Sequence, residues 1–315
     1  MRLGDGKEGK EKNVSDTVGF VGLGLMGSAM SHRLLQNGYR VVGFDLVPKR
    51  MRDLENVGGE SAASVADAVR RAGPVVLSLP NSRHHEEIVS AVGGILEGAH
   101  AKTLILDTTT THPRDTRCAA EMLSARDVSM LDASISGNSV RAAEGNLTFL
   151  VGGTVEAFAK GKPLLEALGK EIIHVGDSGS GAQMKLVVQL ISATTRVALA
   201  EALTFGKQAG LDPEQIMRIL PLTNAHSRQH DFFGPRMVQG AFEEPPSRLR
   251  QFMKDIDLVI EGGQSFGTPL LLTSICRELF RAAAADGGGD LDSSSVIRVY
   301  QKLGGMGAGE NVPNE

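Results

Sequence analysis

The chain has 315 residues, of which 41% are hydrophobic and 22% are charged, and its formal net charge is −4. The length predicts two domains, and the composition is typical of a globular protein in water. The acidic balance argues against a nucleic-acid partner, and polar or charged residues interrupt every long apolar run, which argues against a membrane span. Cys118 and Cys276 lie in amphipathic helical patterns, so we expect core cysteines in a reducing compartment rather than a disulfide.

The two ends of the chain differ from the rest. Residues 1–16 are polar and charged, lack the apolar core of a secretion signal, and carry the acidic residues that mitochondrial transit peptides avoid. We interpret residues 1–16 and 304–315 as disordered tails and expect a cytoplasmic protein.

The segment from residue 17 to residue 50 predicts a dinucleotide-binding site. An apolar run, Val18–Val21, leads into Gly22-x-Gly24-x-x-Gly27, and a helical pattern and a second apolar run ending at Asp45 follow. Gly22 allows a sharp turn, Gly24 lets a phosphate approach the backbone at the helix N-terminus, and Gly27 permits close packing of helix and strand. This order of elements is what a dinucleotide site requires.

Asp45 bears on the choice of cofactor. A carboxylate at the end of the second strand can accept hydrogen bonds from ribose hydroxyls and repels a 2′-phosphate, which favours NAD over NADP. Lys49 and Arg50 follow closely. They are interpreted either as a solvated first helical turn or as basic groups that keep NADP as the alternative.

From residue 17 to about residue 175, short apolar runs alternate with amphipathic segments. Strands are expected at 18–23, 40–45, 75–79, 103–107, 129–133, 147–151 and 172–175. Helices are expected at 26–36, 49–55, 65–72, 86–92, 115–124 and 155–168. This alternation predicts a Rossmann-type α/β domain over residues 17–177, with a mostly parallel sheet covered by helices on both faces.

The pattern becomes helical beyond residue 181. A long interdomain helix is expected from 182 to 208, followed by helices at 213–220, 252–266, 269–284 and 294–303. We therefore predict an all-α C-terminal domain over residues 178–303. The segment DFFGPRM at 231–237 is interpreted as core and loop.

The long helix carries an unusual polar stripe. It is apolar nearly all round, which predicts burial. Lys185, Gln189, Ser192 and Arg196 recur at i, i+4, i+7 and i+11, so they share one face. An ammonium group inside such a helix must be paired or must have a lowered pKa. Lys185 is thus either part of an interdomain salt bridge or a general acid/base whose pKa falls from about 10.4 toward about 7–8.

Two polar segments follow predicted strands. The turn in LDASISGNS (131–139) offers backbone N–H groups and hydroxyls that suit a carboxylate, although it also reads as a plain loop. The hydroxyls of LDTTTTHP (106–113) would face the ligand crevice at the carboxyl edge of the sheet, or serve only as strand and cap residues.

The histidines predict no metal site. His226 and His230 are four residues apart, but no carboxylate or cysteine cluster accompanies them. His84 and His85 are interpreted as the beginning of a polar helix.

Together these segments resemble the β-hydroxyacid dehydrogenase family, which includes 3-hydroxyisobutyrate dehydrogenase and tartronate semialdehyde reductase; the chain is similar to 6-phosphogluconate dehydrogenase as well. The matching pieces are GFVGLGLMGSAM (19–30), SLPNS (78–82), LDTTTTHP (106–113), LDASISGNSVRAAEGNLTFLVGG (131–153), GSGAQMKLVVQLI (179–191) and FMKDIDL (252–258). They occur in the family's order and extend over about residues 17–303.

The resemblance implies an oxidoreductase that transfers a hydride between NAD, or NADP, and a small 3-hydroxy acid or its semialdehyde, bound in a cleft between the domains. It implies that Lys185 moves the proton and that Gln189 orients the substrate oxygen. Its substrate-carboxylate motif corresponds to Ser136, Gly137 and Asn138. The residues that it places at the cofactor are Gly22, Leu23, Gly24, Leu25, Met26, Gly27, Asp45, Leu79, Pro80, Asn81, Thr110 and Lys254, of which Lys254 also lies near the substrate. It further implies a homo-oligomer, a dimer or a tetramer, because the helical domain needs cover.

The departures from the family pattern fall where substrate is expected. Asn138 replaces a glycine, Gln189 an asparagine, Ser247 a phenylalanine and Ser134 a proline. Two alternatives therefore stay open. One is an imine reductase on a related scaffold, although such enzymes generally lack the lysine found here at position 185. The other is a catalytically silent cofactor-binding protein that serves as an interaction module.

Overall fold

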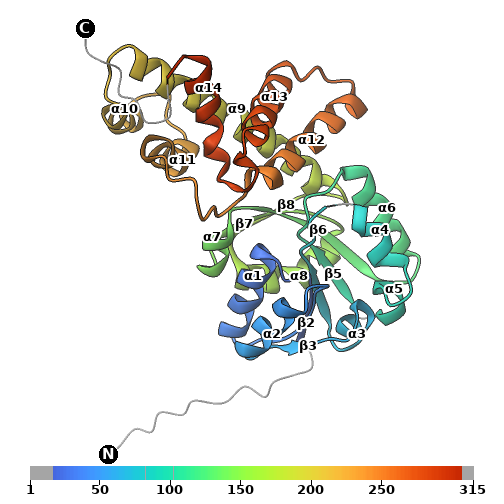
Figure 1. Ribbon diagram of the computed structural model, residues 1–315. Helices are drawn as coiled ribbons and strands as arrows, with labels where there is room; N and C mark the ends of the chain where they lie inside the picture. The colour runs from blue at the N-terminus through green and yellow to red at the C-terminus, as the bar shows by residue number, and fades with distance from the viewer. Residues whose placement is uncertain (1–16, 82, 102, 307–315) are drawn as a thin grey trace, which may run out of the picture. The chain divides into compact units, whose positions relative to one another are not determined.

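The computed structural model describes residues 17–81, 83–101 and 103–306, so most of the two predicted tails lies outside the described residues (Figure 1). The described chain divides into two compact units. The first comprises residues 17–109, 114–137 and 141–181, and the second comprises residues 110–113, 138–140 and 182–306.

One sheet forms the centre of the first unit. Its strands are β1 (Thr17–Val21), β2 (Arg40–Phe44), β3 (Glu60–Ser61), β4 (Pro74–Leu77), β5 (Leu104–Asp107), β6 (Ser129–Ser136), β7 (Leu147–Gly152) and β8 (Gly169–Gly176). Their order in the sheet is β3-β2-β1-β4-β5-β6-β7-β8. Only the β6–β7 pairing is antiparallel among these strands. The predicted fold class is thereby confirmed, whereas the two-residue β3 was missed because it is too short to show a pattern.

Helices cover both faces of this sheet. They are α1 (Leu25–Gln36), α2 (Pro48–Asn56), α3 (Val65–Arg70), α4 (Arg83–Ser90), α5 (Ile95–Gly98), α6 (Pro113–Ser124), α7 (Ser139–Ala143) and α8 (Val155–Leu168). Strand side chains alternate between the faces: Val76 packs with α1 and α8, whereas Val75 and Leu77 pack with α3, α5 and α6 (Figure 1). Apolar residues therefore occur in unbroken runs in the central strands.

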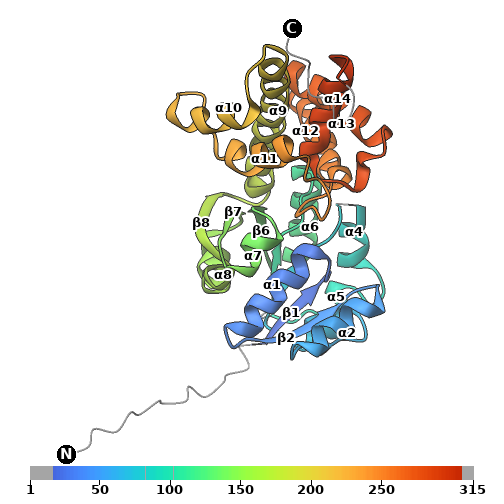
Figure 2. The same ribbon diagram turned by 60° about the vertical axis from the view of Figure 1, so that its left-hand side comes forward.

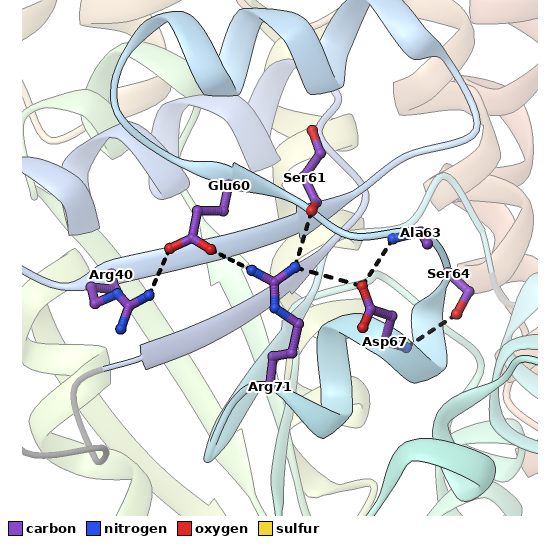
Figure 3. Close-up of polar contacts among 7 residues, drawn as sticks. All are labelled: Arg40, Glu60, Ser61, Ala63, Ser64, Asp67 and Arg71. Carbon is purple, nitrogen blue, oxygen red and sulfur yellow. Dashed lines mark hydrogen bonds and ion pairs between the residues drawn. The ribbon is translucent and has the colours of Figure 1, made fainter.

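The short edge strand β3 is held by charged side chains on the surface. Glu60 pairs with Arg40, at 2.8 Å, and with Arg71 (Figure 3). Arg71 also donates to the carbonyl oxygen of Ser61 over 3.1 Å and lies 3.6 Å from the carboxylate of Asp67 in α3. The cluster ties the edge of the sheet to the helix that follows it.

The second unit is helical. It contains most of α9 (Ser180–Gln208), with α10 (Pro213–Ile219), α11 (Arg228–Gln239), α12 (Leu249–Phe266), α13 (Leu271–Ala285) and α14 (Ile297–Leu303). Figure 2 shows α10 and α11 on one side of α9 and α12, α13 and α14 on the other. Its core consists of apolar side chains from these helices and from the 3₁₀ turn (Ser293–Val296) before α14.

The interpretation of residues 231–237 as core and loop was wrong about the loop, because they lie in α11, but Phe233 and Met237 are in the core as expected. The hydroxyl of Ser227 accepts from the backbone N–H of Gln229, and the Ser227 N–H donates to the His230 ring, forming a capping box. Gly240 ends the helix in the left-handed conformation, with φ 67°. These end signals and the burial of apolar side chains outweigh the helix-breaking tendency of Pro235.

Two burial expectations also need correction. Cys276 is buried as expected, and burial raises the pKa of its thiol to about 11, but Cys118 is exposed. Helix α9 is buried on one side only, since Val187 and Ile191 are 51% and 56% exposed. By length and hydropathy α9 could cross a membrane, yet half of its most apolar window is buried inside the protein. That degree of burial is typical of a core helix.

Candidate functional site

The glycine turn of the first unit has the geometry that a pyrophosphate requires. Gly22 has φ +91°, and a Cβ there would collide with the carbonyl oxygen of Ser78. A Cβ on Gly27 would collide with the carbonyl oxygen of Gly22. By contrast, a Cβ on Gly24 would meet nothing within 4 Å, so space is open at the N-terminus of α1. Turn, open space and helix end together fit the phosphates of a dinucleotide.

Asp45 follows β2 directly and is tied to this turn. Its Oδ2 accepts from the backbone N–H of Leu23 over 2.7 Å, and its Oδ1 accepts from that of Val47 over 2.8 Å. The guanidinium of Arg50 lies 3.2 Å from Oδ2, and its side chain is 46% exposed. The carboxylate therefore fixes the glycine turn and also pairs with the half-exposed guanidinium of Arg50.

The topological switch point of the sheet lies between β1 and β4, where open α/β sheets bind ligands. The segment after β4 contains Leu79, Pro80 and Asn81. Leu79 donates its N–H to the hydroxyl of Thr109 over 3.1 Å, so this segment is joined to the one after β5. Thr110 is the next residue of that second segment.

A buried pair that the sequence did not indicate lies beside these segments. The Nε2 atom of His85, in α4, is 2.5 Å from Oδ2 of Asp107 at the end of β5. Their side chains are 2% and 0% exposed, respectively. The interpretation of His84 and His85 as the beginning of a polar helix is confirmed by α4, whereas the burial of His85 was not expected. A signal was present, since His85 and Val89 are four residues apart and both are buried.

The predicted carboxylate anchor follows β6, which is three residues longer than expected. Ser136 is the last strand residue and pairs with Thr148 of β7. Gly137 has φ +151°, and a Cβ there would press against the side chain of Leu147. Because β6 runs parallel to β5, this turn lies at the same carboxyl edge as the glycine turn. Asn138 follows in one of the two short segments that belong to the second unit.

In the second unit, α9 brings the predicted polar stripe into the interior. Lys185, Gln189, Ser192 and Arg196 are between 5% and 8% exposed. Gln189 Nε2 donates to Oδ2 of Asp255 over 2.5 Å. Lys254 pairs with the other carboxylate oxygen at 3.1 Å. Asp255 thus joins the predicted site residues of α9 and α12.

Lys185 has the electrostatic setting of a proton-transfer group. Burial lowers the pKa of its ammonium, and the nearby positive charge of Lys254 lowers it further. The negative charge of Asp255 opposes both effects. The net pKa lies below the ordinary value of 10.5. A lowered pKa makes a lysine better suited to exchange a proton with a ligand.

Arg196 continues the stripe away from Lys185. Its guanidinium lies 3.7 Å from the ring centre of Phe233 and 4.0 Å from that of Phe252. It donates to Ser293 Oγ over 2.6 Å and to Gln229 Oε1 over 3.4 Å. Burial lowers its pKa to about 9. Its partners come from three distant segments, so no local sequence pattern could reveal them.

The structure groups the predicted site residues in two sets. The first unit holds Gly22, Leu23, Gly24, Leu25, Met26, Gly27, Asp45, Leu79, Pro80, Asn81, Ser136 and Gly137. The second holds Lys185, Gln189 and Lys254, with Thr110 and Asn138 in its two short segments. Over residues 17–81, 83–101 and 103–306, no three His, Cys, Asp or Glu side chains gather as metal ligands would.

Two protein families match the chain along most of its length. The family described as the NAD-binding domain of 6-phosphogluconate dehydrogenase matches residues 17–176. The family described as NAD-binding of NADP-dependent 3-hydroxyisobutyrate dehydrogenase matches residues 179–300. Each of the two units is therefore matched by a family of NAD-binding dehydrogenase segments.

Individual relatives agree with these matches. A probable mitochondrial 3-hydroxyisobutyrate dehydrogenase of Dictyostelium discoideum is 32% identical, covering 91% of this chain and 92% of its own. A 2-(hydroxymethyl)glutarate dehydrogenase of Eubacterium barkeri is 30% identical, covering 94% and 98%. Among solved structures, 3-hydroxyisobutyrate dehydrogenase of Mycobacterium tuberculosis with L-serine superposes with a TM-score of 0.83 at 27% identity, covering 90% and 99%.

Proposed function

The chain belongs to the β-hydroxyacid dehydrogenase family, and we propose that it interconverts a small 3-hydroxy acid and its semialdehyde with Lys185 as general acid and base. It is an NAD(P)-dependent hydroxyacid oxidoreductase, as are the relatives that match it over nine-tenths of its length. The single observation that carries the proposal is the buried Lys185 beside Lys254 and Asp255, with a pKa below its ordinary value.

The role of Lys185 follows from that pKa. A bound nicotinamide supplies or accepts the hydride. In the oxidation direction the neutral amine takes the hydroxyl proton of the substrate, and in the reduction direction the ammonium protonates the carbonyl oxygen. Burial lowers the pKa of Lys185, which brings its charged and neutral forms closer in free energy and eases proton transfer in both directions. Gln189, fixed by its hydrogen bond to Asp255, orients the substrate oxygen.

The substrate class is a small hydroxy acid. Ser136 and Gly137 would receive its carboxylate, because the turn after β6 presents a hydroxyl and backbone N–H groups. Asn138 and Gln189 stand where the family has smaller side chains, and Ser247 stands where it has a phenylalanine. Supporting the class, the relatives include a dehydrogenase named for 3-hydroxyisobutyrate and another named for 2-(hydroxymethyl)glutarate.

We propose NAD as the cofactor. The buried carboxylate of Asp45 would repel a 2′-phosphate, and its two oxygens can share hydrogen bonds with the ribose when Arg50 moves aside. Arg50 is the group that would give NADP a residual affinity, because its half-exposed guanidinium can pair with a phosphate. We therefore expect Asp45→Ala to weaken NAD binding more than NADP binding, and Arg50→Ala to weaken only NADP binding.

A second copy of this chain is the proposed partner of the helical unit. Leu271, Leu272 and Ile275 of α13 are 76%, 69% and 59% exposed. They adjoin a groove that Leu272 and Ile275 line together with α9 residues such as Ala198. An exposed apolar surface of this kind is typical of an association site. Light scattering should find a dimer or a tetramer, and Leu272→Asp with Ile275→Asp should yield a monomer.

The proposed reaction is tested by a substrate panel. The purified chain is assayed with NAD and NADP against 3-hydroxy acids of increasing length, their semialdehydes and cyclic imines. We expect turnover of a hydroxy acid with NAD as the preferred cofactor. Turnover of imines alone would contradict the proposal, and tight NAD binding without any turnover would favour a catalytically silent protein.

A further inference from the structure

The reaction described above leaves the buried pair His85 and Asp107 without a role. Their ionisable atoms lie 2.5 Å apart, and both side chains are almost completely removed from water. A carboxylate in that position is costly unless an opposite charge or several donors compensate it. On the surface, water would stabilise the carboxylate. In the interior His85 must do so, and we therefore expect the pair to fix the positions of the segments that carry the two residues.

The second oxygen of Asp107 connects the pair to the ligand edge of the sheet. Asp107 Oδ1 accepts from the backbone N–H of Thr109 over 3.0 Å. The hydroxyl of Thr109 in turn accepts from the backbone N–H of Leu79 over 3.1 Å. His85, Asp107, Thr109 and Leu79 therefore form one chain of contacts. It joins α4 to the segments that follow β4 and β5.

The charge of His85 is set by groups on two neighbouring elements. Burial disfavours the imidazolium, but the charge and hydrogen bonding of Asp107 and the charge of Asp115, in the first turn of α6, outweigh it. The pKa of His85 is therefore raised above 6.5. Helix α5 also packs against α4, and it carries Glu97. The carboxylate of Glu97 accepts a hydrogen bond from the backbone N–H of Gly93 and is not among the groups that shift the pKa of His85.

We propose that His85 is a positioning residue for cofactor binding. As an imidazolium it neutralises Asp107, and the pair holds the segments after β4 and β5 in the arrangement that receives the nicotinamide half of the cofactor. The inference rests on the proposed function, in which Leu79, Pro80 and Asn81 line the cofactor. It adds a residue that does not itself touch the ligand and makes the affinity dependent on pH.

The direction of that dependence follows from the raised pKa. In this proposal the arrangement that binds the cofactor needs the charged pair, which is complete below the pKa of His85 in the folded protein. The contribution of the pair is lost as pH rises through the higher pKa of the folded protein. Affinity for NADH should thus be greatest in mildly acidic solution and should fall toward alkaline pH, by at most about tenfold per pH unit for one linked proton.

The test measures NADH affinity of the full chain by isothermal titration calorimetry from about pH 6 to about pH 9, where an imidazole titrates. His85→Gln keeps a polar side chain but cannot carry charge. We expect it to bind NADH about tenfold more weakly than the wild type at the acidic end, since fewer molecules hold the competent arrangement. We also expect its affinity to vary little with pH. Wild-type affinity and pH dependence in this variant would overturn the inference.

A second variant covers the outcome in which His85→Gln does not fold. The double variant His85→Gln with Asp107→Asn removes both charges, and an asparagine can still accept from Thr109. It should fold and bind NADH without the pH dependence of the wild type. If the double variant retains the wild-type profile, His85 does not set it and the inference is wrong.

The chain offers a matched control in its exposed His–Asp pair. His226 and Asp231 lie 2.8 Å apart, but their side chains are 34% and 54% exposed. His226→Gln should leave the NADH affinity and its pH profile unchanged, and an equal effect there would overturn the inference. Should the wild type bind neither NADH nor NADPH, the cofactor assignment itself fails. If the wild type binds and His85→Gln binds equally well, only the role of His85 fails.

Discussion

The glycine turn and the polar stripe of α9 differ in the groups that they present. The turn presents backbone groups, whereas the stripe presents side chains. At the turn, we propose that backbone N–H groups and the open space at Gly24 receive the cofactor phosphates. On α9 the proposed proton transfer depends on the buried side chains of Lys185 and Gln189, with Asp255 of α12 bonded to Gln189. One region depends on local conformation, and the other depends on tertiary contacts.

We expect this difference to separate cofactor binding, at the turn, from proton transfer, at α9. Substitutions at a site made of backbone groups do not change its charge. Such variants should therefore lose ligand affinity while the protein stays folded. A buried charged site has a pKa that depends on every neighbour, so its variants should change rates and pH profiles. Variants at the two regions should therefore change different measured quantities.

Replacing Lys185 by methionine should remove proton transfer and leave cofactor binding intact. Methionine fills a similar buried volume without a charge. We expect kcat to fall by about 10³-fold, within the range that general acid–base catalysis contributes. NADH affinity, measured by calorimetry, should stay at the wild-type value.

The matched control for this prediction is Lys207→Met, in the last turn of the same helix. It should have wild-type kcat. An active Lys185→Met variant would contradict the assignment of the general acid and base. If Lys185→Met instead lost NADH binding, the separation between the two regions would be wrong.

Replacing Gly24 by alanine should do the opposite. A Cβ there meets nothing within 4 Å of the protein, so the melting temperature should not change. The methyl group would occupy the space proposed for the pyrophosphate. We expect NADH affinity to fall by about tenfold to about a hundredfold, as when a ligand loses good backbone hydrogen bonds.

Gly73→Ala is the control for Gly24→Ala, since a Cβ at Gly73 also meets nothing within 4 Å and the residue precedes β4 at the other edge of the sheet. It should leave both stability and affinity unchanged. Unaltered NADH binding by Gly24→Ala would place the pyrophosphate elsewhere. A large loss of stability would mean that the turn is a packing feature.

The pH profile of oxidation can resolve the neighbours of Lys185. Oxidation needs the neutral amine, so kcat/KM should rise as pH increases through the pKa of Lys185. Asp255 raises that pKa and Lys254 lowers it. We therefore expect Asp255→Asn to move the midpoint to lower pH and Lys254→Met to move it to higher pH, each by about one unit or less.

Opposite displacements are the informative result here, because disruption of the fold would lower activity without moving the two midpoints apart. Midpoints that move together, or do not move, would show that another group controls the profile. Both midpoints are read from initial rates with NAD at saturating concentration.

The same contrast explains how far the sequence could predict the molecule. The turn at Gly22 and the succession of strand, turn, helix and strand around it have local signatures, so the fold class followed from the sequence and is confirmed. The spacing of Lys185, Gln189 and Arg196 also predicted a shared face, because a helix has a fixed period. Partners that come from distant segments had no such signature. Gln229 reaches Ser192, and Phe233 stacks on Arg196, from a helix that the sequence did not predict.

His85 shows the same limit within the first unit. Its burial could be inferred from its spacing to Val89, but its partner Asp107 lies on a strand and becomes a neighbour only through the order of the sheet. The corrected burial of Cys118 has the same origin. A helical period tells which residues share a face, whereas the packing of the fold decides which face is covered.

The smallest effect is expected from the surface cluster around Glu60, although Glu60 and Arg71 make several polar contacts (Figure 3). The side chain of Glu60 is 42% exposed and that of Arg71 is 35% exposed, so water and salt screen the charges. We expect Glu60→Gln to reduce the free energy of unfolding by less than about 1 kcal/mol at neutral pH, and by less still in high salt. Urea unfolding at low and high ionic strength measures both values.

The pH dependence of that small effect has a definite sign. The hydrogen bond from Arg40 lowers the pKa of Glu60 below 4.5, burial opposes this, and the charges of Arg40 and Arg71 reinforce it. A lowered pKa in the folded state gives stability that is present above the unfolded pKa and is lost as pH falls through the folded pKa. Wild type and Glu60→Gln should therefore converge in acid. A loss well above about 1 kcal/mol that salt does not reduce would show that β3 depends on this cluster. In that case an exposed charge pair would stabilise the protein strongly, and burial would not decide how much a charge pair contributes to stability.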